Sequence, residues 1–265
     1  MKSLVCWSGG KDSALALHET RRRGDGDVVG LLTTLSAEFD RVSMHGVRRE
    51  LLEMQATALG LPVEKVLLPT PPPDAPCPVS IPRPTHGFTV FATNGSYEEK
   101  MLEAFRRGRD QVVEAIVSGD IFLEDLRAYR EQLLAEAGLQ GVFPLWKRHT
   151  RELMQDFIGS GFRAIVVCVD SKKLDSSWAG RFLDEAFLRD LPSGVDPCGE
   201  NGEFHTFVFD GPGFRNPVPF LVGETVSREP FWFCDLKETF SACSGRPGQV
   251  RGEPAQLRGA AQRPV

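Results

Sequence analysis

Short apolar runs alternate with amphipathic patterns over the first half of the chain. Four apolar runs have the length and composition of buried strands, and they cover residues 3–7, 28–35, 63–68 and 111–117. Helical patterns separate them; one begins at residue 11, and others cover residues 46–60 and 97–107. Such alternation is typical of a parallel sheet with helices on both faces. We therefore predict an α/β fold for this half.

The pattern changes near residue 125. Helical patterns and strand-like runs then follow one another at residues 123–138, 150–158, 163–170, 178–188, 203–209 and 225–233. We predict two units, an α/β domain over residues 1–125 and a smaller α/β domain over residues 126–235. Residues 236–265 are rich in Gly, Pro, Arg, Gln and Ala without apolar periodicity, so we expect a disordered tail there.

Prolines crowd one segment of the first half, PTPPPDAPCPVSIPRPTHG at residues 69–87. Because proline cannot donate a backbone hydrogen bond, this segment is neither a helix nor a central strand. A segment this long and irregular inside a compact domain is typical of a functional loop or of a mobile one. The sequence does not indicate which of the two it is.

Composition and charge exclude several classes of function. With 265 residues the chain can bury a substantial core, and its net charge of −5 argues against a general nucleic-acid surface or an anionic membrane surface. No apolar run approaches the roughly 20 residues of a membrane span and no signal peptide is indicated, so we expect a cytoplasmic protein. The six cysteines form no CxxC pair and no zinc-ligand spacing, which favours reduced thiols.

One hexapeptide, SGGKDS at residues 8–13, stands between the first strand-like run and the first helical pattern. Glycines at the end of a buried strand let the backbone approach a ligand, and the free N–H groups at the start of a helix attract an anion. The spacing fits neither a Walker A loop nor a dinucleotide-binding fingerprint, because the glycines are adjacent and Asp12 follows Lys11. The alternative to an anion site is a plain glycine turn capped by serine.

Carboxylates stand where later strands begin or end. Gly119 and Asp120 come after the fourth strand-like run, where open parallel sheets bind ligands, so Asp120 is a candidate for contact with a nucleotide or magnesium. A helix N-cap is the alternative. Glu200 and Glu203 flank Gly202 in a segment that enters a later strand. Such carboxylates are suited to hold magnesium, orient an ammonium ion or accept a proton, although a polar hairpin turn has the same composition.

Other residues are weaker candidates. His45 and Arg48 open the helical pattern after the second strand-like run, from where they could reach phosphate or substrate or simply start the helix. Cys198 adjoins the acidic segment and is a candidate sulfur carrier or nucleophile. The local charge is negative and gives no reason for a reactive thiolate, so a structural role is favoured for Cys198.

The hexapeptide SGGKDS resembles the PP-loop of the ATP pyrophosphatases, which cleave ATP between its α and β phosphates. Segments at residues 43–62, 118–131, 174–192 and 196–214 make the chain similar to the diphthine–ammonia ligase branch of that family over most of residues 3–230. CGENGEFHTFV resembles a bacterial-type subgroup, and His205 stands where the ligase branch usually carries an acidic residue. The resemblance implies a Rossmann-like ATP domain of the HUP type, followed by a smaller domain that completes the active-site cleft.

The resemblance also implies roles for individual residues. It implies that ATP and Mg²⁺ are bound by Ser8, Gly9, Gly10, Lys11, Asp12, Ser13, Gly119 and Asp120, with Asp12 and Asp120 nearest the metal. It places catalysis on Lys11, Asp12, Glu200 and Glu203, and substrate contact on His45, Arg48, Arg127, Gly202 and Thr206. Nucleotidyl transfer is catalysed largely by fixed charge around the moving oxygens, which these residues supply.

The predicted activity is that of an ATP-dependent, AMP-forming ligase. A substrate carboxylate is adenylated with release of pyrophosphate and then amidated by ammonia. By resemblance the acceptor is diphthine on translation elongation factor 2; bacteria do not make diphthamide, so a bacterial chain needs another carboxylate. Two alternatives stay open, a PP-loop enzyme that transfers sulfur to tRNA and a nucleotide-binding regulator without turnover. The sequence fixes neither the acceptor, nor the ammonia source, nor whether the chain forms a homo-oligomer.

Overall fold

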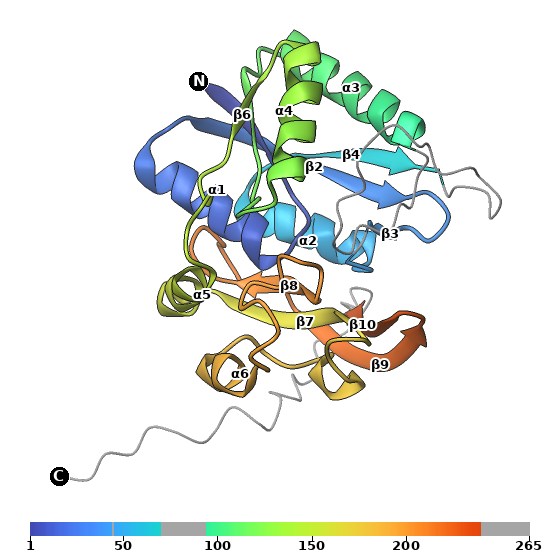
Figure 1. Ribbon diagram of the computed structural model, residues 1–265. Helices are drawn as coiled ribbons and strands as arrows, with labels where there is room; N and C mark the ends of the chain where they lie inside the picture. Colours follow the sequence, from blue (N-terminus) through green and yellow to red (C-terminus); the bar gives the residue numbers. More distant parts are fainter. Residues whose placement is uncertain (44, 70–93, 240–265) are drawn as a thin grey trace, which may run out of the picture.

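The computed structural model describes residues 1–43, 45–69 and 94–239 of the chain. The proline-dense segment at residues 69–87 lies outside these ranges except for Pro69, and so does the tail after residue 239. Figure 1 shows two sheets with helices α1 and α2 between them. Among the described residues, no helix combines the length and the apolar character needed to cross a membrane.

The first sheet has a parallel core in the order β4-β2-β1-β5-β6. Its strands are β1 (Lys2–Cys6), β2 (Asp27–Ser36), β4 (Val63–Leu68), β5 (Ala115–Val117) and β6 (Gln140–Val142), and the short antiparallel β3 (Arg41–Val42) pairs with the end of β2. β5 lies beside β1, so residues that follow these two strands meet at one edge of the sheet. The predicted Rossmann-like α/β fold is confirmed.

Helices cover both faces of the first sheet, as predicted. On one face lie α1 (Lys11–Arg23) and α2 (Arg49–Leu59), and on the other lie α3 (Asn94–Asp110) and α4 (Glu124–Ala137). Each pair buries its apolar side chains in a separate hydrophobic cluster, one on either side of the sheet.

Helix α2 shows how the sequence produces this layer. Its apolar residues recur every three or four positions, so Leu51, Leu52 and Leu59 fall on one face, and each is at most 5% exposed. The helix ends at Gly60, whose φ of +66° suits the left-handed conformation at a helix C-terminus. The polar residue Gln55 lies on the same buried face and belongs to the site described below.

The second sheet is antiparallel, in the order β8-β7-β10-β9. Its strands are β7 (Arg163–Asp170), β8 (Phe204–Asp210), β9 (Phe220–Arg228) and β10 (Phe231–Glu238), accompanied by α5 (Thr150–Gly159), the 3-10 turn η1 (Ser176–Trp178) and α6 (Glu185–Asp190). One hydrophobic cluster contains residues of α1 and α2 together with Phe204 and Phe207 of β8. The two sheets therefore share a common core on the α1–α2 side.

The structure differs from the predicted elements at several places. The last strand of the first sheet is β6, which ends at residue 142, and all later strands belong to the second sheet. The sequence pattern, by contrast, changes near residue 125. The strand predicted at residues 225–233 is a hairpin of β9 and β10, because Pro230 stands in the turn. The helix predicted at residues 178–188 is replaced by η1, a bridge at Phe182 and the short α6. Residues 236–238 of the predicted tail belong to β10.

Candidate active site

Residues 8–13 form the turn from β1 into α1, at the sheet edge that β5 also reaches. Gly9 has a φ of +78°, and Gly10, the N-cap of α1, has no side chain that could cap the helix. The hydroxyl oxygens of Ser8 and Ser13 lie 3.4 Å apart, and Ser8 Oγ accepts a hydrogen bond from Gly10 N. Hydroxyls and the positive end of a helix dipole thus meet at one place, which is suited to an anion.

Position 9 requires glycine for two reasons, its positive φ and the close approach of Gln55. A Cβ at this position would lie 2.6 Å from Gln55 Oε1. Gly24 is a matched control, because its φ is +69° and no atom would lie within 4 Å of its Cβ. We expect Gly24→Ala to lower the free energy of unfolding by about 1 kcal/mol and Gly9→Ala to lower it clearly more and to abolish ATP binding. Urea denaturation and calorimetric titration with ATP measure both effects; equal destabilisation would contradict this packing.

Strand β8 of the second sheet supports the glycine loop. Thr206 Oγ1 accepts a hydrogen bond from Lys11 N at 3.0 Å, and Val208 N donates to Gly9 O at 2.9 Å. Helix α1 is therefore capped by a side chain that lies 195 positions further along the chain. The structure shows the hydroxyl of Thr206 at this cap, and the substrate contact expected of Thr206 stays a prediction.

Gln55 fixes the same loop from α2. The residue is fully buried; its Nε2 donates to Gly9 O at 2.9 Å and to Val208 O at 2.6 Å, and its Oε1 accepts from Trp7 Nε1 at 3.0 Å. One amide therefore links β1, the glycine loop and β8. Gln55 is not among the predicted site residues, although an amide on the apolar face of a helix is the signal that indicates such a role.

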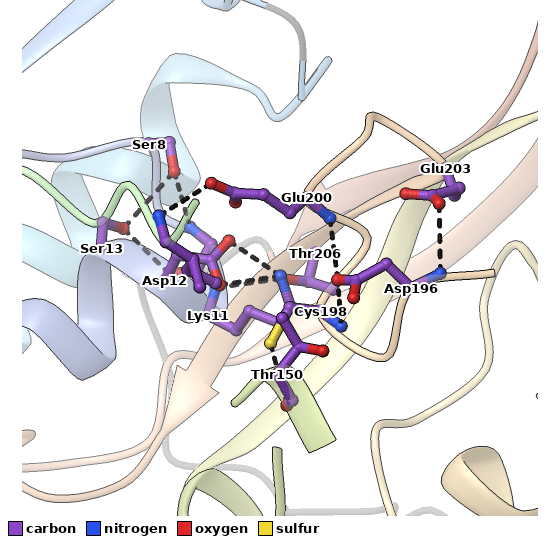
Figure 2. Close-up of polar contacts among 12 residues, drawn as sticks. Ser8, Lys11, Asp12, Ser13, Thr150, Asp196, Cys198, Glu200, Glu203 and Thr206 are labelled. Carbon is purple, nitrogen blue, oxygen red and sulfur yellow. Dashed lines mark hydrogen bonds and ion pairs between the residues drawn. The ribbon is translucent and has the colours of Figure 1, made fainter. Parts of the chain in front are cut away.

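Lys11 and Asp12 form an ion pair in the first turn of α1 (Figure 2). Lys11 Nζ lies 2.9 and 2.8 Å from the two carboxylate oxygens of Asp12, and 5.3 Å from the ring centre of Phe204. The side chain of Lys11 is 5% exposed and that of Asp12 is 34% exposed. Burial alone would lower the pKa of Lys11, but the Asp12 carboxylate raises it above its usual value. Lys11 is therefore a fixed cation beside the loop.

The end of β5 packs against the first turn of α1. Gly119 and Asp120 follow this strand. A Cβ on Gly119 would lie 2.8 Å from the backbone carbonyl group of Asp12, so glycine is needed for this close approach. Asp120 is 7% exposed, and Arg130 Nε of α4 donates to its Oδ1 at 3.2 Å and lies 3.0 Å from Oδ2. Oδ2 is buried and accepts no hydrogen bond from the described part of the chain. Such an oxygen is suited to a cation.

Glu200 reaches this edge from the loop that precedes β8. Its Oε1 accepts a hydrogen bond from Ile121 N at 2.8 Å, directly after Asp120. Figure 2 shows its carboxylate on the side of Ser8, Ser13 and Asp12. Burial raises the pKa of Glu200 to about 8, and the Asp12 carboxylate adds to the shift. Glu200 therefore exchanges its proton close to neutral pH, as a general acid or base does.

Glu203 has different surroundings, although the sequence pairs it with Glu200. Its Oε1 accepts hydrogen bonds from Asp196 N and Asn201 Nδ2, both at 3.1 Å, and its Oε2 accepts from Asn201 N at 3.0 Å. Gly202, with a φ of +85°, forms the turn between them. In Figure 2, Asp196 lies between Glu203 and the Lys11–Asp12 pair. This geometry favours a role for Glu203 in shaping the loop.

Of the two residues predicted at the start of α2, His45 reaches the glycine loop. Its Nε2 would lie 3.1 Å from a Cβ on Gly10, and its ring centre is 4.5 Å from that of His205 on β8. Burial lowers the pKa of His45 to about 4, so the ring is neutral at neutral pH. Arg48 instead donates two hydrogen bonds to Asp235 of β10, at 3.2 and 2.8 Å, and joins α2 to the second sheet.

Arg127, the predicted substrate contact on α4, packs beside aromatic rings. Its guanidinium carbon lies 4.6 Å from the ring centres of both Phe143 and Trp146, and its Nε donates to Glu131. The arginine of this helix that reaches the site is Arg130, three positions further on. The sequence places both arginines on one helix, and the substrate contact expected of Arg127 stays a prediction.

Magnesium would fit these residues together with phosphates. Across residues 1–43, 45–69 and 94–239, no three His, Cys, Asp or Glu side chains are grouped as a complete metal site. Magnesium commonly takes one or two carboxylates and completes its shell with water and phosphate oxygens. Asp120, through Oδ2, and the partly exposed Asp12 on the facing helix turn suit that description.

Comparisons with known proteins relate the chain to one family. A family model described as the diphthamide synthase N-terminal domain matches residues 1–69, and one described as the diphthamide synthase C-terminal domain matches residues 149–240. The diphthine–ammonia ligase of Bos taurus is 27% identical over 240 residues, which cover 86% of this chain and 85% of the relative. Those of Danio rerio (27% identity, 83% and 86% coverage) and Homo sapiens (26% identity, 82% of each) are comparably similar. The matched segments include the glycine loop and Glu200.

Proposed function

The chain belongs to the diphthine–ammonia ligase-like family, and from this premise we propose that it is an ATP-dependent ligase that forms an amide with AMP and pyrophosphate as by-products. In the first step an oxygen of a substrate carboxylate attacks the α-phosphorus of ATP, the bond to the bridging oxygen breaks, and pyrophosphate leaves. Ammonia then attacks the carbonyl carbon of the acyl-adenylate. The carbon–oxygen bond to AMP breaks, and the nitrogen loses a proton to a base.

The proposal is carried by one observation, that the glycine loop, the Lys11–Asp12 pair and Glu200 meet at one edge of the first sheet. The loop and the hydroxyls of Ser8 and Ser13 bind the pyrophosphate part of ATP, and Lys11 neutralises the charge that develops as it leaves. Because Lys11 is buried, its charge acts where water screens it little. A regulator that only binds a nucleotide has less need of this set of charges.

Asp12 and Asp120 hold the magnesium ion that accompanies ATP in this proposal. When bound, the ion neutralises phosphate charge during the transfer. Because Gly119 has no side chain, the backbone before Asp120 can approach the backbone of Asp12 closely.

Glu200 is the proposed base of the amidation step. With a pKa of about 8, a fraction of its side chains is ionised at neutral pH and can accept the proton that the nitrogen loses. The N–H of Ile121 holds Oε1, which orients the carboxylate. Glu203 keeps the surrounding loop in shape through Asp196 and Asn201.

The raised pKa of Glu200 has a consequence for stability. Its pKa rises from 4.5, the value of an unperturbed glutamate, to about 8 in the folded protein, so between these values the folded state binds one more proton. The stabilisation is therefore complete below about pH 4.5 and is lost as the pH rises to about 8, at about 1.4 kcal/mol per pH unit. Glu200→Gln should remove this slope. Urea denaturation at several pH values measures it in both proteins; identical slopes would contradict the pKa assigned to Glu200.

The acceptor is proposed to be a carboxylate. The relatives are named as diphthine–ammonia ligases, so a diphthine-bearing protein is the first acceptor to test. His205 stands beside His45 at the glycine loop, at the position where the ligase branch usually has an acidic residue, which is a reason to test other carboxylates as well.

The described cysteines do not favour transfer of sulfur to tRNA. Cys198, the cysteine beside Lys11 and Glu200, is 2% exposed, and its Sγ donates to Thr150 O at 3.3 Å. Burial raises the pKa of Cys198 well above its usual value, so it stays a thiol. A sulfur carrier needs an accessible thiolate.

Pyrophosphate release from magnesium-ATP tests the proposed function. The reaction is run with ammonium and with a cell extract as the source of acceptor, and each is left out in turn. We expect release of pyrophosphate and AMP that requires the acceptor. ATP binding without pyrophosphate release under any of these conditions would contradict the ligase and favour a nucleotide-binding regulator.

A further inference from the structure

Arg130 of helix α4 contacts the carboxylate of Asp120, which follows β5. Arg130 Nε lies 3.2 Å from Oδ1 and 3.0 Å from Oδ2 of Asp120. The Arg130 side chain is 26% exposed and that of Asp120 is 7% exposed, so the pair is largely shielded from water. Charges in such a place are costly to bury unless each is held by a partner in a fixed geometry.

Asp120 is the carboxylate that contacts Arg130. Tyr97 of α3 and Cys6 of β1 lie nearby, but burial raises the pKa of each, so both are neutral at neutral pH. Burial would lower the pKa of Arg130, and Asp120 raises it above its usual value, so the guanidinium stays charged. Among the described residues, Arg130 is therefore the cation that orients the Asp120 carboxylate.

The contact satisfies one carboxylate oxygen with a hydrogen bond and the other by charge alone. Oδ1 accepts the hydrogen bond from Arg130, while Oδ2 lies 3.0 Å from Arg130 Nε, is buried and accepts no hydrogen bond within the part of the chain that the structure describes. A buried acceptor that lacks a hydrogen bond costs free energy, and a ligand that binds it recovers that cost. Gly119 places this carboxylate next to the first turn of α1, where Asp12 lies.

We propose that Arg130 is a positioning residue of the nucleotide site, which orients Asp120 so that Oδ2 binds the divalent cation that accompanies ATP. The inference rests on the proposed function, because the cation is the one that arrives with ATP. Arg130 touches neither the cation nor the nucleotide. Partners that orient a metal-binding side chain typically change the metal affinity 10- to 100-fold when they are removed.

Binding of Mn²⁺ in the presence of a non-hydrolysable ATP analogue tests this role without turnover. Electron paramagnetic resonance measures the free Mn²⁺. We expect Arg130→Met to weaken Mn²⁺ binding about 10- to 100-fold. The matched control is Arg106→Met, because Arg106 pairs with Glu136 at the exposed surface of the same two helices, α3 and α4. The control should bind Mn²⁺ as the wild type does.

Thermal unfolding of each variant separates positioning from packing. If Arg130→Met is less stable but binds Mn²⁺ like the wild type, Arg130 only packs and the proposal is overturned. Should Arg130→Met not fold, Arg130→Gln gives the same comparison with a polar side chain, and wild-type affinity again overturns it. Failure of the proposed function has another signature: the wild type would release no pyrophosphate, while the dependence of Mn²⁺ binding on Arg130 would persist.

Discussion

Substitution of Lys11 by methionine is expected to lower acceptor-dependent pyrophosphate release about 100- to 1,000-fold. Methionine keeps the length of the side chain and fills the buried space beside Phe204, but it removes the charge that neutralises the leaving pyrophosphate. The initial rate at saturating ATP measures the effect. A loss of this size identifies Lys11 as a group that stabilises the transition state rather than one that only binds ATP.

Two controls accompany Lys11→Met. The first is Arg22→Met on the same helix. Arg22 is 61% exposed and pairs with Glu19, so the rate of pyrophosphate release by this variant should stay within about twofold of the wild type. Because Lys11→Met leaves the Asp12 carboxylate without its partner, thermal unfolding is followed on the same samples. A folded Lys11→Met protein that binds ATP and keeps more than about a tenth of the rate would contradict the role given to Lys11.

Replacement of Gln55 by leucine is expected to lower the free energy of unfolding by about 3–5 kcal/mol. Leucine has a similar volume, but it leaves Trp7 Nε1 and Val208 O without the partner that Gln55 provides. Gly9 O keeps the hydrogen bond from Val208 N, so it adds less to the cost. Each buried polar group that loses its partner costs about 1–3 kcal/mol. Urea denaturation measures the change, and ATP binding should be lost with the loop geometry.

The matched control for this prediction is Gln132→Leu. Gln132 is exposed on α4, and the same exchange of side chains there should change the free energy of unfolding by no more than about 0.5 kcal/mol. If Gln55→Leu were as mild as Gln132→Leu, the buried amide would not be what joins the glycine loop to β8.

The site residues that the sequence could predict are those whose positions follow from the ends of neighbouring strands or from adjacency in the chain. The glycine loop follows β1 and Asp120 follows β5, and the ends of neighbouring parallel strands meet at one edge of the sheet. Lys11 and Asp12 are adjacent in the same helix turn, so their contact is local as well. The alternation of strands and helices predicts a parallel sheet, and the resemblance to HUP domains implies that β5 lies beside β1, as it does in the structure.

Contacts that depend on how distant elements pack could not be predicted in this way. Thr206 caps α1 from 195 positions away, and no periodicity in the sequence relates the two. Arg127 and Arg130 lie almost one turn apart on α4, and only the packing of that helix decides that Arg130 reaches Asp120. Arg48 is a plausible phosphate ligand by position, but Asp235 of the distant β10 binds it.

In the proposed reaction the chain cleaves ATP between its α and β phosphates. Phosphorus NMR of a reaction with magnesium-ATP, ammonium and an acceptor source, with contaminating pyrophosphatase inhibited by fluoride, identifies the products directly. We expect the wild type to form AMP and pyrophosphate in equal amounts. Lys11→Met should form both products far more slowly. ADP and orthophosphate, or intact ATP with every acceptor tested, would contradict the account.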